Sequence, residues 1–80
     1  MINVLFFARL KEDVGQGQMQ LDDSFVGQSI AQLRQHLIAQ GMSALQDDSI
    51  RMALNQNFCS ADHKIQAGDE VAFMPPVTGG

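Results

Sequence analysis

The sequence contains no tryptophan, no tyrosine and a single cysteine, Cys59, among its 80 residues. One cysteine cannot form an internal disulfide, so the chain lacks the cross-linked framework of many small secreted domains. Five phenylalanines and five methionines must supply most of the bulk of its core. A chain of this length buries only about 60–65% of its unfolded surface, which predicts one small domain.

Positive charge is scarce as well: five Lys and Arg residues face nine Asp and Glu residues, for a net charge of −4. Nucleic acids and anionic membranes are bound by basic surfaces, so we expect neither as a partner, and a protein with a basic surface fits better. The longest apolar run covers residues 4–8, whereas a membrane span needs about 20. The N-terminus also lacks a signal-peptide pattern, so we expect a cytoplasmic protein.

Strands are predicted where apolar and polar residues alternate. Residues 2–9 have one wholly apolar face and carry Leu5 and Phe7 on the other, which predicts a strand near the centre of the sheet. After about one helical turn at residues 10–14, residues 18–21 alternate again and should complete a hairpin. Further strands are predicted at residues 51–55 and 70–74.

One main helix is predicted between the strands. Ser29 followed three residues later by Gln32 has the form of a capping box, which marks a helix start. Ile30, Leu33 and Leu37 then fall on one stripe at helical spacing, and Gly41 is a natural stop.

This order of elements predicts an α+β fold in which one mixed sheet wraps a single helix. It is the ubiquitin-like β-grasp pattern. The first and last strands should pair in parallel at the sheet centre.

Few residues suggest a catalytic or metal site within the domain. Cys59, His63 and His36 are scattered over two loops and a helix without paired-ligand spacing, so no metal site is predicted. Cys59 is interpreted as a small buried hydrophobe and His36 as a half-exposed helix residue. The acidic doublets at residues 22–23, 47–48 and 69–70 all fall in predicted turns, where Asp is favoured for its local hydrogen bonds.

The C-terminal residues 75–80 have no packing role in this scheme. Pro75 and Pro76 remove two backbone donors and must end the last strand, which divides the chain into a domain at residues 1–74 and a flexible tail at 75–80. Such a tail reaches roughly 20 Å at about 3.3 Å per residue. Gly79 and Gly80 lack Cβ atoms, so they can pass a narrow channel and leave the terminal carbonyl unshielded. A frayed terminus is the plainer alternative.

The last eleven residues, Glu-Val-Ala-Phe-Met-Pro-Pro-Val-Thr-Gly-Gly, resemble the ending of the small subunits of molybdopterin synthases, a family of ubiquitin-like sulfur carriers. Leu-Phe-Phe-Ala at 5–8, Leu-Arg-Gln-His-Leu at 33–37 and Asn-Gln at 55–56 extend the resemblance over essentially the whole chain. Departures are mild: Lys11 stands where Arg is usual, Met74 where a second Phe is common, and Thr78 where Ala or Ser often occurs.

The resemblance implies a function for the terminal carboxylate of Gly80. An activating enzyme resembling ubiquitin-activating enzymes would adenylate it with ATP, and a sulfur donor would convert it to a thiocarboxylate. The tail, with Pro75, Pro76, Val77, Thr78 and Gly79 leading to Gly80, would enter the large synthase subunit, two small subunits flanking a dimer of large ones. There the sulfur would attack a cyclic pyranopterin precursor to form a dithiolene. The large subunit would supply the catalytic side chains, and the chain itself would bind no cofactor.

Phe7, Phe73 and Met74 are expected to form an apolar partner surface near the start of the tail, because so small a domain cannot bury every large residue. Two other interpretations stay open. A thiamine-pathway sulfur carrier shares the fold and the Gly-Gly end but is usually shorter and lacks the two prolines. A ubiquitin-like modifier would instead join Gly80 to a lysine of another protein.

Overall fold

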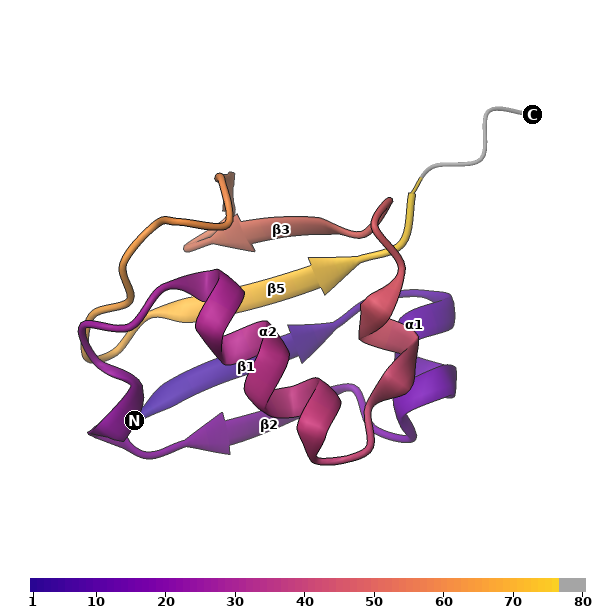
Figure 1. Cartoon of the computed structure of the whole chain (residues 1–80), viewed down its shortest axis with the longest axis horizontal. Coiled ribbons are helices and arrows are strands. Elements are labelled where there is room, and N and C mark those ends of the chain that lie inside the picture. The colour runs from indigo at the N-terminus through magenta and orange to yellow at the C-terminus, as the bar shows by residue number, and fades with distance from the viewer. Residues whose placement is uncertain (77–80) are drawn as a thin grey trace.

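The computed structural model describes residues 1–76, and its sheet has five strands in that range. Figure 1 shows the arrangement. The elements are β1 (Ile2–Phe6), α1 (Arg9–Val14), β2 (Gln18–Leu21), the 3-10 turn η1 (Asp23–Phe25), α2 (Ile30–Ala39), the 3-10 turn η2 (Ser43–Gln46), β3 (Arg51–Leu54), β4 (Asn57–Phe58) and β5 (Glu70–Met74).

The sheet has the order β2-β1-β5-β3-β4, with β1 and β5 parallel at its centre and every other pair antiparallel. Val4 pairs with Val71 and Phe6 with Phe73 in the central register. Parallel strands end at the same edge of a sheet, so the ends of β1 and β5 lie together. The predicted central pairing of the first and last strands is confirmed.

Two strand ends differ from the sequence prediction, and the backbone explains both. The first strand stops at Phe6 because Ala8 adopts φ 53° and ψ −130°, which turns the chain out of the sheet into α1. The third stops at Leu54 because Asn55 and Gln56 both have positive φ, 51° and 71°. Positive φ at two successive residues is the geometry of a tight hairpin turn, so β4 begins at the next residue, Asn57.

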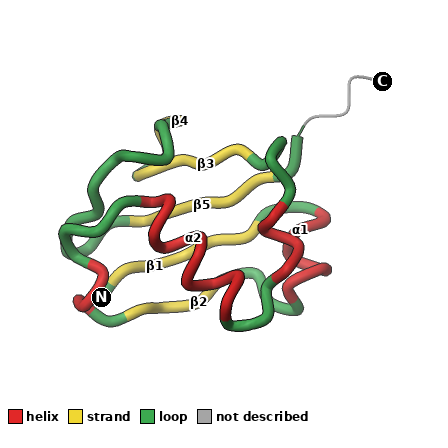
Figure 2. Tube along the Cα trace, in the orientation of Figure 1, coloured by secondary structure: helices red, strands yellow, loops and turns green. Residues whose placement is uncertain are grey.

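Helix α2 begins and ends where the sequence predicts. The Ser29 hydroxyl accepts a hydrogen bond from the Gln32 amide at 3.1 Å, and the Gln32 side chain accepts one from the Ser29 amide at 2.7 Å. This capping box satisfies two amides that a helix start leaves unpaired. Gly41 follows the C-cap with φ 107°, a conformation that glycine adopts without strain. Figure 2 shows α2 lying across the strands.

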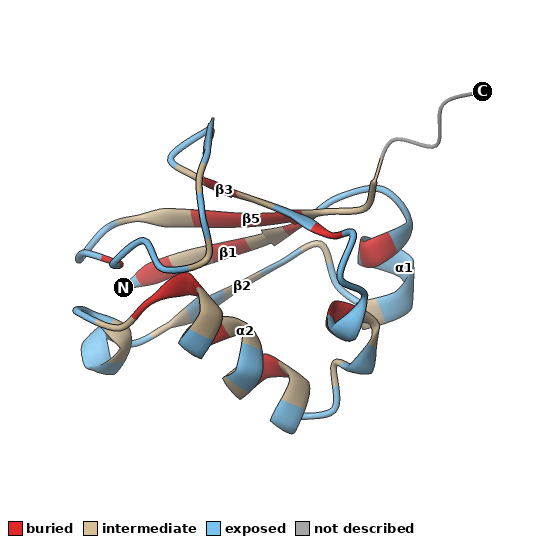
Figure 3. Ribbon diagram, turned by 45° about the horizontal axis from the view of Figure 1, so that its top comes forward, coloured by how far each residue is buried: buried red, intermediate tan, exposed pale blue. Residues whose placement is uncertain are grey.

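The core lies between α2 and one face of the sheet (Figure 3). Alternate residues of β1 and β5 point into it, and α2 contributes its apolar stripe. The fully or nearly fully buried side chains of these elements are Ile2, Val4, Phe6, Ile30, Leu33, Leu37, Val71 and Phe73. No helix among residues 1–76 covers the opposite face, which we call the open face.

Candidate functional site

The C-terminal tail leaves the sheet directly after β5. Pro75 and Pro76 follow Met74, are half-buried and belong to no strand. Proline has no amide hydrogen, so the β5 ladder cannot continue through them. Val77, Thr78, Gly79 and Gly80, the remaining predicted tail residues, lie outside the described part of the chain.

Phe7 is fixed beside the start of the tail. Its amide donates to the carbonyl of Phe73 at 3.1 Å, which prolongs the β1–β5 ladder by one step. Phe6 and Phe73 pair and face the core, so the next residues, Phe7 and Met74, turn to the open face. The Phe7 side chain is 46% exposed. Met74 is half-buried.

The expectation that Phe73 belongs to an exposed patch is wrong. Its side chain is fully buried, and its ring stacks on that of Phe6 with centroids 6.0 Å apart. Strand alternation is the reason: Phe73 pairs with Phe6 on one side and with Met52 on the other, all on the core side of the sheet. Phe7 and Met74 are placed on the open face, and their contact with a partner stays a prediction.

Phe58 is a candidate interface residue that sequence reasoning missed. Its side chain is 68% exposed, the highest value among the large apolar residues of the described range 1–76, and it lies on β4 opposite Ala53. The guanidinium carbon of Arg51 lies 5.3 Å from the centroid of its ring. The turn at Asn55-Gln56 could have predicted the exposure of Phe58. The length of a hairpin turn sets the register of its strands, and the register decides which face of the sheet Phe58 occupies.

These residues form two neighbouring rows on the open face. The registers place Leu5, Ala72, Ala53 and Phe58 in one row across β1, β5, β3 and β4. The second row holds Phe7, Met74 and Arg51, next to the tail. We call these seven residues the open-face patch. Phe7, Phe58 and Arg51 are exposed and Leu5 and Met74 are half-buried, whereas Ala53 and Ala72 are each only 5% exposed. Exposed aromatic side chains near the point where the tail leaves the domain are suited to docking another protein.

A cleft of about 590 Å³ adjoins the patch at Phe7. Its lining residues are Phe6, Phe7, Ala8, Lys11, Gly17 and Gln18. The Lys11 stem lies close over Gly17, where an added Cβ would come within 3.1 Å of the Lys11 Cε. Bulk at residue 17 would therefore shift the flexible end of the Lys11 side chain.

The domain does not offer an activated nucleophile in Cys59. Burial raises the pKa of the Cys59 thiol, which disfavours the thiolate, the nucleophilic form. Its Sγ lies 3.9 Å from the carbonyl oxygen of Met52. His36 packs edge-on against Phe25, with ring centroids 4.7 Å apart. Cys59 is half-buried, where the sequence predicted a buried side chain, and His36 is half-exposed as predicted; both side chains pack against neighbouring residues.

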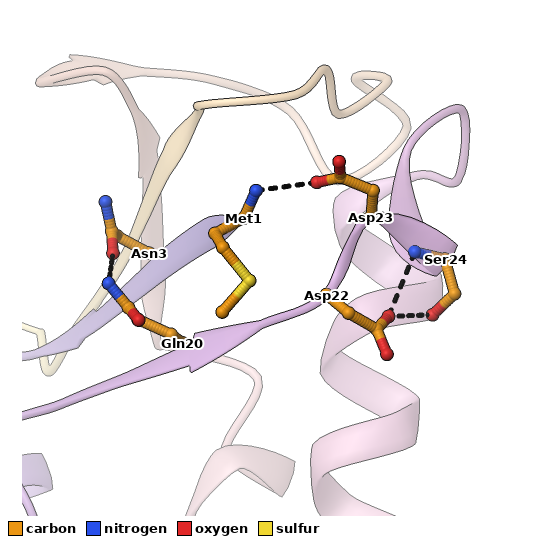
Figure 4. Close-up of polar contacts among 6 residues, drawn as sticks. All are labelled: Met1, Asn3, Gln20, Asp22, Asp23 and Ser24. Carbon is orange, nitrogen blue, oxygen red and sulfur yellow. Dashed lines mark hydrogen bonds and ion pairs between the residues drawn. The ribbon is translucent and has the colours of Figure 1, made fainter.

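Of the acidic residues predicted in turns, Asp22 and Asp47 bind serines of their own turns, whereas Glu70 is the first residue of β5, so its placement in a turn was wrong. Figure 4 shows Asp22 accepting hydrogen bonds from the amide and hydroxyl of Ser24, while Asp23 pairs with the N-terminal ammonium at 2.7 Å. Asp47 is held in the same way by Ser49. These serine hydrogen bonds hold the pKa values of Asp22 and Asp47 below the ordinary range. Both side chains are thus charged at neutral pH and serve their turns, as the sequence indicates.

A mixed sheet wrapped on one helix, with a tail that follows its central strand, defines a ubiquitin-like β-grasp protein. Two solved structures show the same fold. SAMP1 from Haloferax volcanii matches with a TM-score of 0.78 and 23% identity, over 99% of this chain and 98% of that one. A chain of the complex of subunits 1 and 2 of the molybdopterin-converting factor from Helicobacter pylori 26695 matches with a TM-score of 0.71 and 21% identity, over 99% and 97%.

The model of the ThiS family matches residues 4–80, and the chain belongs to this family. Two curated relatives are similar along their whole length. The chain is 46% identical to the molybdopterin synthase sulfur carrier subunit of Escherichia coli K12, and 40% identical to the protein of the same name in Haemophilus influenzae, with 100% of each chain covered. No helix within residues 1–76 has the length and apolar character of a membrane span.

Proposed function

We propose that this chain is the sulfur carrier subunit of a molybdopterin synthase and that Gly80 carries the sulfur as a C-terminal thiocarboxylate. The observation that carries the proposal is the full-length 46% identity to the Escherichia coli subunit of that name. The family match that extends to residue 80 supports it, because it includes the Gly-Gly end.

The chemistry begins at a carboxylate, which is a poor electrophile. An activating enzyme would join Gly80 to the AMP portion of ATP and release pyrophosphate, which gives the carbonyl carbon a good leaving group. A sulfur nucleophile would then form a bond to that carbon and expel AMP, leaving the thiocarboxylate. Gly79 and Gly80 add no side chain that would obstruct either attack.

The sulfur donor and the activating enzyme would be separate proteins. Cys59 is half-buried with its Sγ at the carbonyl oxygen of Met52, and burial raises its pKa, so we assign the sulfur to Gly80 and a packing role to Cys59. The chain would therefore act as a sulfurtransferase only within the complex, where the large subunit supplies catalytic side chains and binds a cyclic pyranopterin. Because activation consumes ATP, we place the reaction in the cytoplasm.

The open-face patch would dock the large subunit, with two copies of this chain flanking a large-subunit dimer. Phe7 and Met74 lie beside the start of the tail, so a protein that receives the tail would also cover them. Phe58 would extend the contact across the sheet to β4. The Helicobacter pylori structure is a complex of subunits 1 and 2, which supports a two-subunit assembly here.

Intact-mass measurement tests the proposal. The chain is incubated with its organism's activating enzyme, ATP and a sulfide source, and should gain the mass of one oxygen-to-sulfur exchange, located at Gly80 by fragmentation. The large subunit and pterin precursor should then remove it. A chain lacking Gly80 is the control and should gain nothing. Binding to a thiazole synthase instead of the large subunit would favour the thiamine pathway, and isopeptide bonds to other proteins would favour a modifier.

A further inference from the structure

The open-face patch contains one charged side chain, Arg51. Its Cα lies opposite that of Met74 in the β3–β5 ladder, and its guanidinium lies over the exposed ring of Phe58 at 5.3 Å. Within residues 1–76 it makes neither an ion pair nor a side-chain hydrogen bond; the ion pairs there join Met1 to Asp23 and Arg9 to Asp13. Arg51 thus lies on an otherwise apolar face without an acidic partner among these residues.

The position of the Arg51 guanidinium over the Phe58 ring suits it to bind a carboxylate. A guanidinium lying on an aromatic face has its N–H donors around its edge, and their spacing matches the two oxygens of a carboxylate. Contact with the ring also restrains a long side chain that would otherwise lose rotamer freedom on binding. Arg51 therefore presents a partly pre-organised anion-binding group at the rim of the patch.

The position of Arg51 also restricts which kind of partner surface can dock over the open-face patch. A partner that buried Phe58 and Met74 under purely apolar surface would leave the guanidinium desolvated without a counter-charge, which is strongly unfavourable. None of the seven patch residues carries a carboxylate, so a second copy of this chain could meet Arg51 only with Glu70, which lies on the open face at the opposite end of β5 from Met74. A partner with an acidic side chain at this place meets no such penalty.

We propose that Arg51, held on the ring of Phe58, donates paired hydrogen bonds to a carboxylate of the large subunit and thereby helps select that partner. This inference rests on the proposed function. The large subunit is the expected occupant because Met74, opposite Arg51, leads directly into Pro75 and the tail. A protein that receives the tail thus approaches on the side of Arg51.

The test measures the dissociation constant between the full-length chain and its organism's large subunit for the wild type and for Arg51→Gln, Arg51→Lys and Lys64→Gln. Removing one member of a buried charge pair should weaken binding at least about tenfold for Arg51→Gln. Arg51→Lys keeps the charge but loses the planar fork, so its loss should be intermediate. Lys64→Gln is the matched control: it removes an exposed charge from the loop before β5 and should leave the constant within about twofold.

Two further measurements separate a direct contact from a structural effect. Added salt should weaken the wild type more than Arg51→Gln, and the thermal midpoints of the two proteins should agree. Adding Phe58→Ala to Arg51→Gln should cost less affinity than the product of the two single effects, because the ring positions the guanidinium.

The outcomes distinguish this inference from the proposed function. A wild-type chain that does not bind the large subunit overturns both. A wild-type chain that binds, with Arg51→Gln binding within about twofold of it, overturns the inference alone, as does an equal loss from Lys64→Gln. Strictly multiplicative effects of Arg51→Gln and Phe58→Ala would overturn the positioning by Phe58.

Discussion

Phe73 and Phe58 are the same residue type on the same sheet, and the structure assigns them opposite roles. Phe73 is fully buried against Phe6, whereas Phe58 is 68% exposed on the open face. Truncating each to alanine should therefore separate stability from partner binding. Phe73→Ala should reduce the free energy of unfolding and Phe58→Ala the affinity for the large subunit.

The magnitudes follow from burial. Deleting a buried phenyl ring costs about 3–5 kcal/mol, against roughly 4–12 kcal/mol for the whole stability of a chain of this length. For Phe58 only about a third of the side chain is shielded from water, so its truncation should cost about 0.5–1 kcal/mol of transfer free energy. Loss of the contact with the Arg51 guanidinium should cost about 0.5–1 kcal/mol more, since the site is exposed. Phe73→Ala should thus be at least about one and a half times as destabilising as Phe58→Ala.

The assay is urea unfolding of both variants, followed by their affinity for the large subunit. Because Phe73→Ala removes much of the stability, Phe73→Leu serves as the folded core variant for binding. Phe58→Ala should lose about five- to tenfold in affinity or more, as an exposed aromatic anchor does, while Phe73→Leu should bind as the wild type does. Equal losses of unfolding free energy for the two alanine variants would refute the assignment of faces. Weaker binding by Phe73→Leu than by Phe58→Ala would refute the location of the interface.

Three further outcomes are expected. One residue added after Gly80 should abolish sulfur loading and leave the thermal midpoint unchanged, because loading needs a free terminal carboxylate; loading with the extension still attached would contradict this. Cys59→Ser should load as the wild type does by intact mass, and sulfur found on Cys59 with none on Gly80 would contradict the mechanism. The folded pKa of Asp47 is lowered by the Ser49 hydrogen bonds, so its contribution to stability is present above the usual carboxyl pKa near 3.8 and lost as the pH falls below it. Urea midpoints measured from pH 6 to about pH 2 should therefore fall less steeply for Ser49→Ala than for the wild type, and parallel curves would show that this bond does not form in solution.

The sequence by itself determined the features that depend on neighbouring residues. The capping box at Ser29 and Gln32 and the glycine at 41 set the limits of α2, because helix ends are fixed by hydrogen bonds and backbone angles within a few residues. Pro75 ended β5 for an equally local reason, its missing amide hydrogen. The apolar residues on both faces of the first and last strands predicted that these strands pair at the centre of the sheet.

Only the tertiary structure decided which face each side chain occupies, because register depends on pairing between strands far apart in the sequence. The sequence does not distinguish Phe73 from its neighbour Met74, because both are large apolar residues of one strand. Pairing with Phe6 and Met52 places the Phe73 side chain in the core. Phe58 reaches the open face because the positive φ angles of Asn55 and Gln56 bring it opposite Ala53. The stacking of Arg51 on Phe58 follows from the same register and has no local signature, since a cation and a ring seven positions apart meet only after the hairpin has formed.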